Sequence, residues 1–105
     1  MSWNVIYTEQ AELDLRNIFE YIDYVLLAPD AARNKSKIVM DAISTLDEMP
    51  FRHQRYKKEP WHSKGMRFIL VDNYIIFFFI LESEKIVAVV RIMYGGRDIE
   101  NLLSL

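Results

Sequence analysis

The N-terminal residues alternate between apolar and polar side chains before the spacing of apolar residues changes. Trp3, Val5 and Tyr7 share one face of an extended chain, and the residues between them share the other. This period of two predicts a short strand over residues 3–8. Thr8 is then placed to cap a following helix, because its side-chain oxygen can accept a hydrogen bond from a backbone N–H of the first turn.

Two amphipathic helices are predicted to follow this strand. The first ends near Leu27 and has one apolar stripe at helical spacing, formed by Ala11, Leu15, Ile18, Ile22 and Val25. The second begins at Pro29, which suits the first position of a helix. It ends near Glu48 or Met49, because Pro50 disfavours helical backbone in the residue before it. Its apolar stripe is Val39, Ala42, Ile43 and Leu46, and the short connection predicts a helical hairpin.

The second half of the chain is predicted to be a loop followed by strands. Residues 51–64 show no apolar period, which predicts a loop. Strand-like residues then run from 66 to 81, interrupted by a turn signal at Asp72-Asn73. Residues 74–81 are apolar on both faces, so we expect them to form a central strand that helices cover on one side.

The last strand and a short helix complete the pattern. Residues 86–94 are rich in β-branched side chains and predict a strand, which Gly95-Gly96 ends. Unbroken alternation predicts one face formed by Val87, Val89, Arg91 and Met93. The opposite face is then formed by Val90, Ile92 and Tyr94. Residues 97–103 predict a short C-terminal helix.

The expected order of elements is β-α-α-β-β-β-α, with both long helices early and three strands late. Such segregation is typical of an α+β fold. We expect a small twisted, mostly antiparallel sheet packed against an N-terminal helical hairpin. The chain has no internal repeat and no linker rich in Pro, Gly or Ser, which predicts one domain over residues 1–105.

Composition narrows the classes of function. With 51% apolar and 27% charged residues among 105, the chain resembles folded globular proteins. Cysteine is absent, which excludes disulfides, thiolate metal sites and a cysteine nucleophile. The first residues lack the pattern of a signal peptide, and the longest charge-free run, residues 73–81, is too short for a membrane helix. We therefore expect a cytoplasmic protein without a membrane partner.

Charge is unevenly distributed, although the net charge is only −2. Residues 1–48 carry nine acids against four bases, whereas residues 52–67 carry six bases against Glu59 alone. Tyr56 and Trp61 lie between these bases. The basic stretch is either a solvated loop or a contact surface for phosphates or acidic side chains. Its aromatic residues suit base stacking and a protein interface equally.

The candidate chemistry is limited. No motif for nucleotide or metal binding is present, and His53 and His62 lie nine residues apart in one loop, so we expect no metal site and no cofactor. Metal-free RNA cleavage would require a base, an acid and cations around the phosphate. Five residues could supply these groups if the strands bring them together: Lys64, Arg67, Arg91, Tyr94 and Arg97. The alternatives are an ion pair between Arg91 and an acid of the helical half, and a position at the rim of the core for Tyr94.

Four stretches spread over nearly the whole chain form an ordered set. They are Tyr7–Leu15 with Ile18 and Tyr21-Ile22, then Pro50, then Gly65-Met66-Arg67 with Asn73-Tyr74, and finally Arg91–Ile99 with Leu102-Leu103. Together they resemble the toxins of the RelE/ParE superfamily from bacterial type II toxin–antitoxin modules. The resemblance implies a small twisted sheet with a packed helical hairpin, in agreement with the elements predicted above, and a cognate antitoxin as partner.

The superfamily has two mechanistic branches, and this chain departs from one of them. RelE-like members cleave mRNA in the ribosomal A site, whereas ParE-like members are associated with poisoning of DNA gyrase. In RelE-like and YoeB-like nucleases an arginine follows the residue that matches Tyr74, and here that position is Ile75. A YoeB-like nuclease has a histidine before its C-terminal tyrosine, whereas Met93 precedes Tyr94 here. The closing Tyr-Gly-Gly-Arg-Asp-Ile segment resembles the ParE-like pattern.

The resemblance therefore implies a growth-inhibiting toxin that an antitoxin neutralises, with DNA gyrase as the favoured target. The alternative is a ribosome-dependent mRNA endoribonuclease whose catalytic groups are Arg67, Tyr94 and Arg97. A third alternative is a non-toxic module that binds only the antitoxin. In either toxic mechanism the residues expected to contact the target are Arg55, Lys57, Lys58, Lys64, Arg67, Arg91 and Arg97. A homodimer is compatible with the sequence.

Overall fold

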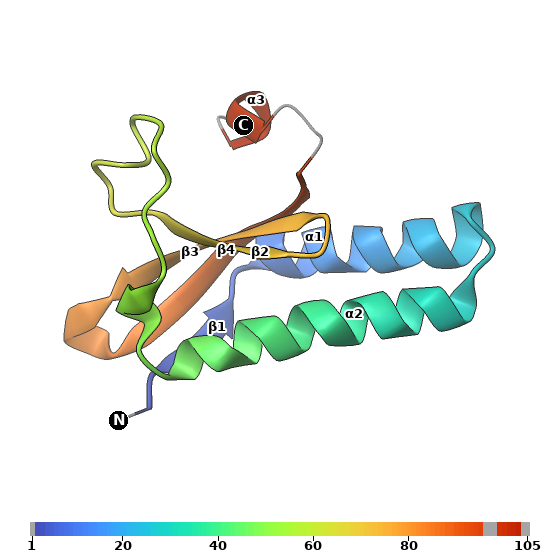
Figure 1. The fold of residues 1–105 in the computed structure, drawn as a ribbon, viewed down its shortest axis with the longest axis horizontal. Helices are drawn as coiled ribbons and strands as arrows, with labels where there is room; N and C mark the ends of the chain where they lie inside the picture. Colours follow the sequence, from blue (N-terminus) through green and yellow to red (C-terminus); the bar gives the residue numbers. More distant parts are fainter. Residues whose placement is uncertain (1, 96–98, 104–105) are drawn as a thin grey trace.

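A four-stranded sheet carries a helical hairpin on one face in the computed structural model, which describes residues 2–95 and 99–103 (Figure 1). The elements in chain order are β1 (Asn4–Tyr7), α1 (Glu9–Glu20), α2 (Pro29–Ser44), β2 (Arg67–Val71), β3 (Tyr74–Leu81), β4 (Ile86–Tyr94) and α3 (Ile99–Leu103). This order confirms the expected β-α-α-β-β-β-α arrangement and the α+β class.

The strands lie in the order β1-β4-β3-β2, so the two longest strands are the inner ones. β2, β3 and β4 form the predicted antiparallel meander. β1 pairs with β4 in parallel, with Asn4 opposite Ile86 and Tyr7 opposite Val89. The sheet is therefore mixed and mostly antiparallel. β3 lies inside it because a strand that is apolar on both faces requires cover on both faces.

Thr8 fixes the start of α1, as predicted. Its Oγ1 accepts a hydrogen bond from the Ala11 backbone N–H at 3.2 Å and donates to the Val90 carbonyl at 3.4 Å, so the cap also ties the helix to β4. After α1 the chain continues as a π-helical turn, Tyr21–Val25. The wider turn rotates Val25 away from the apolar stripe, and this side chain is 63% exposed instead of facing the core.

α2 begins at Pro29, as predicted, but ends at Ser44, about one turn early. The chain continues there as a 3-10 turn, Thr45–Asp47, in which the Thr45 hydroxyl donates to the Ala42 carbonyl at 2.6 Å. Hydroxyl groups that bond to nearby carbonyls compete with the helical hydrogen bonds. This competition accounts for the early end of the helix, which the position of Pro50 alone does not reveal.

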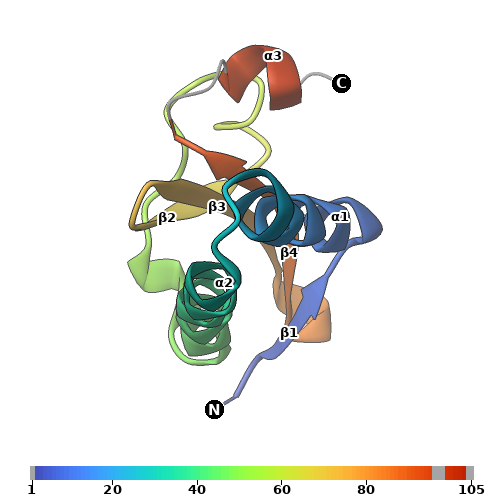
Figure 2. The same cartoon turned by 90° about the vertical axis from the view of Figure 1, so that its right-hand side faces the viewer.

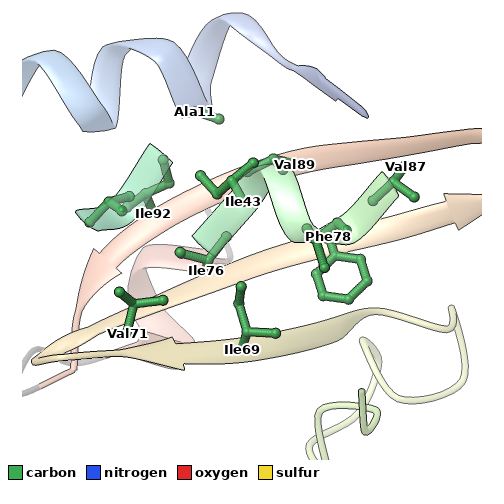
Figure 3. Packing of buried hydrophobic residues seen from close by; sticks show 11 residues of the cluster. Ala11, Ile43, Ile69, Val71, Ile76, Phe78, Val87, Val89 and Ile92 are labelled. Carbon is green, nitrogen blue, oxygen red and sulfur yellow. The ribbon is translucent and has the colours of Figure 1, made fainter. Parts of the chain in front are cut away.

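The main core lies between the sheet and the helical hairpin (Figure 3). Ala11 of α1 and Val39 and Ile43 of α2 are fully buried against the strands. The strands contribute Ile69, Val71, Ile76, Phe78, Val87, Val89 and Ile92. The apolar stripes predicted for the two helices therefore cover this face of the sheet.

A second, smaller core lies on the opposite face of the sheet. Figure 2 shows α3 on the side of the sheet away from α2. Met66, Phe77 and Met93 are almost fully buried there, together with Ile99 of α3. The partly buried side chains around them include Tyr56, Trp61, Phe68 and Leu102. The long loop before β2 and the C-terminal helix therefore cover the face that the hairpin leaves open.

A β-bulge in β4 changes which residues share a face. The pairing of β3 with β4 skips Val90, so this residue has no partner in the register. An extra residue of this kind reverses the alternation beyond it. Val89 and Ile92 accordingly both lie in the main core, whereas Met93 lies in the second core. The predicted face of Val89, Arg91 and Met93 is therefore wrong, because a period of two does not anticipate the bulge.

Candidate functional site

A buried ion pair joins α1 to β4. Arg91 donates from Nε to Asp14 Oδ2 at 2.8 Å and from Nη2 to Asp14 Oδ1 at 3.1 Å. The carboxylate also accepts from the Ile92 backbone N–H at 2.9 Å and from Gln10 Nε2 at 3.0 Å. Arg91 Nη1 donates to the Leu102 carbonyl at 3.1 Å. The same guanidinium therefore also ties α3 to the sheet.

The burial of the Asp14–Arg91 pair indicates a structural role. The side chains of Asp14 and Arg91 are only 8% and 20% exposed. A carboxylate this buried requires several donors to offset its lost hydration, and Asp14 has four. The structure thus supports the ion-pair interpretation of Arg91. Its guanidinium is largely occupied inside the fold, and its predicted contact with a target stays a prediction.

Arg67 holds the loop that precedes its own strand. Its Nη1 donates to the His53 carbonyl at 2.5 Å and lies 3.5 Å from the carbonyl oxygen of Phe51. The guanidinium carbon lies 5.2 Å from the centre of the Phe51 ring, which is a cation–π contact. Burial, and then the charge of Arg55, lower the pKa of Arg67, but a guanidinium stays protonated in proteins. Much of this side chain is therefore engaged in the fold.

Arg67 and Tyr94 do not come together. Arg67 pairs with Phe78 in the middle of β3, and Tyr94 pairs with Tyr74 at its start. The two positions on β3 are roughly 14 Å apart along the strand, and β2 and β4 flank β3 on opposite sides. The third residue expected for a nuclease, Arg97, lies outside the described residues. The structure thus does not assemble Arg67 and Tyr94 into one catalytic site.

The two positions that depart from the nuclease pattern both belong to the second core. Met93 is 3% exposed, and Ile75 packs against the same cluster. Tyr94 is 47% exposed, and its ring meets that of Tyr74 edge-on with 5.9 Å between centroids. Burial raises the pKa of Tyr74. Neither Ile75 nor Met93 can carry a proton or stabilise a phosphorane beside these tyrosines.

Four of the five cations of the basic loop, residues 52–66, are exposed without a bonded partner among the described residues. Within the described part of the chain their exposed side chains make no hydrogen bond or ion pair; they are Arg55, Lys57, Lys58 and Lys64. Glu59, the one acid of the loop, accepts from the Ser63 N–H at 3.0 Å and from Ser63 Oγ at 2.7 Å. These hydrogen bonds lower the pKa of Glu59, and His62 Nδ1 lies 3.8 Å from the carboxylate. The loop acid is therefore already partnered.

The aromatic residues of the basic loop pack against the sheet. Tyr56 meets Trp61, Phe68 and Phe77 edge-on, with 6.1, 6.1 and 5.2 Å between ring centroids. Its hydroxyl donates to Glu100 of α3 at 3.3 Å, and burial, followed by this carboxylate, raises the pKa of Tyr56. The rings anchor the loop on the second core, so they do not offer the stacking surfaces that the sequence suggested.

A groove of about 990 Å³ opens beside the Asp14–Arg91 pair. Its walls come from α1, the π-helical turn, the first turn of α2, the paired ends of β3 and β4, and α3. The apolar and aromatic lining residues include Ile18, Tyr21, Leu26, Tyr74, Tyr94 and Leu102. The sequence gives no signal for this groove, because its walls lie far apart along the chain.

The hairpin tip, residues 21–27, extends this apolar surface. Tyr21, Tyr24, Val25 and Leu26 are each more than half exposed, and Leu27 is 80% exposed. Tyr21 and Leu26 also line the groove, so the tip and the groove form one continuous surface. Contiguous exposed apolar residues of this kind mark interaction sites. The sequence signal for the tip is the apolar run over residues 24–27, which exceeds what the helical stripe requires.

His53 occupies a protected position at the start of the basic loop. Its ring meets Phe78 edge-on at 5.9 Å between centroids, and its Nε2 is buried without a hydrogen-bond partner among the described residues. Burial, and then the charges of Arg52 and Arg67, lower the pKa of His53. These surroundings therefore favour the neutral imidazole.

The described residues hold neither a metal cluster nor a membrane span. Within residues 2–95 and 99–103, no group of three His, Cys, Asp or Glu side chains is arranged to hold a metal ion. In the same part of the chain, every helix is too short or too polar to cross a membrane. Two surfaces of the described residues stand out instead: the basic loop, and the apolar groove with the hairpin tip.

Comparison with known proteins points to one family. A family model described as the ParE toxin of the type II toxin–antitoxin system parDE matches residues 5–99. No curated protein sequence matches the chain.

Solved structures share the fold at low sequence identity. The chromosomal ParDE toxin–antitoxin system from P. aeruginosa aligns with a TM-score of 0.73 and 19% identity, over 89% of this chain and 96% of that one. The RelBE2 toxin–antitoxin complex from Mycobacterium tuberculosis aligns with a TM-score of 0.63 and 18% identity, over 90% and 99%. A mutant of the E. coli toxin RelE in the free state gives 0.66 and 12%, over 99% and 93%.

Proposed function

Because the chain belongs to the ParE toxin family of type II toxin–antitoxin systems, we propose that it inhibits growth by acting on DNA gyrase and that a cognate antitoxin neutralises it. The family match over residues 5–99 carries this proposal. The gyrase target comes from the association of the ParE-like branch with gyrase poisoning, which the sequence resemblance already implied.

The local chemistry around Tyr94 supports gyrase over mRNA. Ile75 and Met93 replace the arginine and the histidine of the nuclease pattern, and Arg67 lies on a different part of the sheet. The loss of one charge-stabilising donor lowers a rate by about 10²–10³, and the loss of an acid or base lowers it by about 10²–10⁴. We therefore expect mRNA cleavage to be absent or weak.

Induction of the chain in cells separates the two targets. We expect a DNA-damage reporter to rise as growth stops, and primer extension on cellular mRNA to show no codon-positioned cuts. Cuts that disappear in the Tyr94→Phe variant would contradict the proposal and place the chain in the nuclease branch. Normal growth, with antitoxin binding retained, would identify a non-toxic module instead.

The groove and the hairpin tip are the surface that we assign to the antitoxin. They offer a continuous apolar strip between α1, α2 and the sheet, which is the kind of surface that takes the apolar face of a partner helix. Two of the structures that share this fold are described as toxin–antitoxin systems or complexes. A partner that covers the strip would also remove an exposed apolar patch from water.

Charged substitutions in the strip test this assignment. Tyr24→Asp combined with Leu26→Asp should weaken antitoxin binding at least tenfold, about 1.4 kcal/mol, because a carboxylate would be buried at the interface. Met40→Asp is the matched control, since Met40 is an exposed apolar residue that lies about 16 Å along α2 from its start. Equal affinities of the tip variant, the control and the unchanged chain in a titration would show that the antitoxin binds elsewhere.

A further inference from the structure

We infer that the basic loop binds the phosphate backbone of duplex DNA without reading its base sequence. The inference rests on the proposed function, because it takes the DNA on which gyrase acts as the ligand of this surface. It assigns the contact to Arg55, Lys57, Lys58 and Lys64.

The other two cations of residues 52–67, Arg52 and Arg67, are already bonded within the fold. The Arg52 guanidinium donates to the carbonyls of Glu48 and Met49 and to that of Thr45, so it caps the end of the helical segment. Arg67 is held by the His53 carbonyl and by the Phe51 ring. The four cations named above remain exposed without a partner among the described residues, and the only acid of the loop is bonded to Ser63.

Hydrogen bonds and ring contacts tie the loop to the sheet. The Tyr56 N–H donates to the Met66 carbonyl at 2.8 Å, and the Phe68 N–H donates to the Gln54 carbonyl at 3.3 Å. Arg55 also forms an isolated β-bridge with Arg67. With the Tyr56 ring fixed on the second core, little backbone freedom is left to lose on binding. A cationic surface of this kind is preorganised for a rigid polyanion.

The side chains of the loop favour phosphates over a protein partner. Three of its four free cations are lysines, which protein interfaces contain less often than the rest of the surface, whereas phosphate contacts use lysine readily. Protein interfaces depend on aromatic anchors, but Tyr56 and Trp61 are directed into the second core. The same inward packing leaves no ring to stack on bases. The contact is therefore electrostatic and independent of sequence.

The distribution of charge orients the molecule for such a contact. Residues 1–48, which form β1 and the hairpin, carry nine acids against four bases. Figure 1 shows the hairpin on one side of the sheet and the loop before β2 on the other. A strong negative field from DNA therefore attracts the loop and repels the helical side. The apolar strip on the hairpin is thereby kept away from the DNA.

The salt dependence of binding to a fluorescent 20-base-pair duplex of arbitrary sequence tests the inference. If four phosphates are neutralised, the Kd of the full-length chain should rise about 150-fold between about 50 and about 200 mM salt. With Lys57, Lys58 and Lys64 all changed to alanine, the same step should raise the Kd only about 3.5-fold. Replacement of the three lysines by arginine should restore the original slope, because phosphates accept either cation.

Controls keep this test separate from the proposed function. Lys37→Ala removes an exposed lysine paired with Asp41 on α2 and should leave the slope unchanged. No binding by the unchanged chain at about 50 mM salt, tighter binding to an RNA duplex than to DNA, or an unchanged slope in the triple alanine variant would each overturn the inference. Gyrase poisoning is measured separately, so its presence without DNA binding would refute only the inference.

Discussion

Asp14 is the residue at which α1, β4 and α3 are joined. Its carboxylate holds Arg91, and Arg91 in turn holds the Leu102 carbonyl. A buried ion pair adds little net stability compared with apolar residues of the same size, but the removal of one partner leaves a buried charge alone. The pair therefore fixes how the elements are arranged, and its loss is costly.

Asp14→Ala should lower the free energy of unfolding by about 3 kcal/mol or more, because Arg91 is then left uncompensated in a largely buried position. Asp41→Ala breaks the exposed pair with Lys37 and should change the free energy by less than about 1 kcal/mol. Urea denaturation of both variants measures the difference. Similar losses in the two variants would show that Asp14 is not a structural centre.

His53 should make stability depend on pH. Its pKa is lowered in the folded chain, whereas in the unfolded chain it titrates near the ordinary value of about 6.5. Between these two pKa values the unfolded chain binds more protons, so the free energy of unfolding falls as the pH falls below about 6.5. His53→Asn should remove this part of the pH dependence, measured by urea denaturation at several pH values.

His62→Asn is the control for this effect, because His62 is an exposed histidine of the same loop. This variant should keep the loss of stability at acidic pH. If His62→Asn flattens the pH profile and His53→Asn does not, the protected position of His53 is not the cause.

The long elements follow from local patterns, and the irregular ones do not. The apolar stripes of α1 and α2, the Thr8 cap and the turn at Asp72-Asn73 are each set by neighbouring residues, so the sequence alone predicts them. The π-helical turn at 21–25 and the bulge at Val90 have no counterpart in the local pattern of apolar residues. Each inserts one extra residue into a regular period, which no periodic pattern can show.

Leu27 gives an element-scale test of the hairpin tip. It has a left-handed φ of 53° and is 80% exposed, a conformation that costs a non-glycine residue about 1–2 kcal/mol. Leu27→Gly should therefore leave the free energy of unfolding unchanged or raise it by up to about 1 kcal/mol. Val25→Gly, in the preceding helical turn, should lower it by about 0.3–0.5 kcal/mol. Urea denaturation that shows equal losses in both variants would contradict the conformation of the turn.

The whole molecule separates two surfaces. An apolar strip lies along the helical hairpin and the ends of β3 and β4, and the basic loop covers the second core on the opposite face of the sheet. We assign the strip to the antitoxin and the loop to DNA, so a bound antitoxin need not compete directly for the loop. Under these two proposals, one small chain would bind its partners on separate surfaces.

The functional surfaces were only partly predictable from the sequence. The basic stretch is visible as a charge pattern, but nothing in the sequence distinguishes Arg55 and Arg67 within it, or Arg91 on the last strand, by what each contacts. Their tasks differ because the fold brings Asp14 to Arg91 across 77 positions of the chain and places the His53 carbonyl beside Arg67. Partners of this kind are set by tertiary structure, so sequence spacing cannot distinguish a free cation from an occupied one.

The most direct measurement combines the purified chain with DNA gyrase and plasmid DNA. We predict that denaturation of the gyrase after incubation releases cleaved plasmid, in an amount that rises with the concentration of the chain. The same preparation should leave mRNA on programmed ribosomes intact. Normal supercoiling without cleaved plasmid, together with cuts in the ribosomal A site, would contradict the assignment of gyrase as the target.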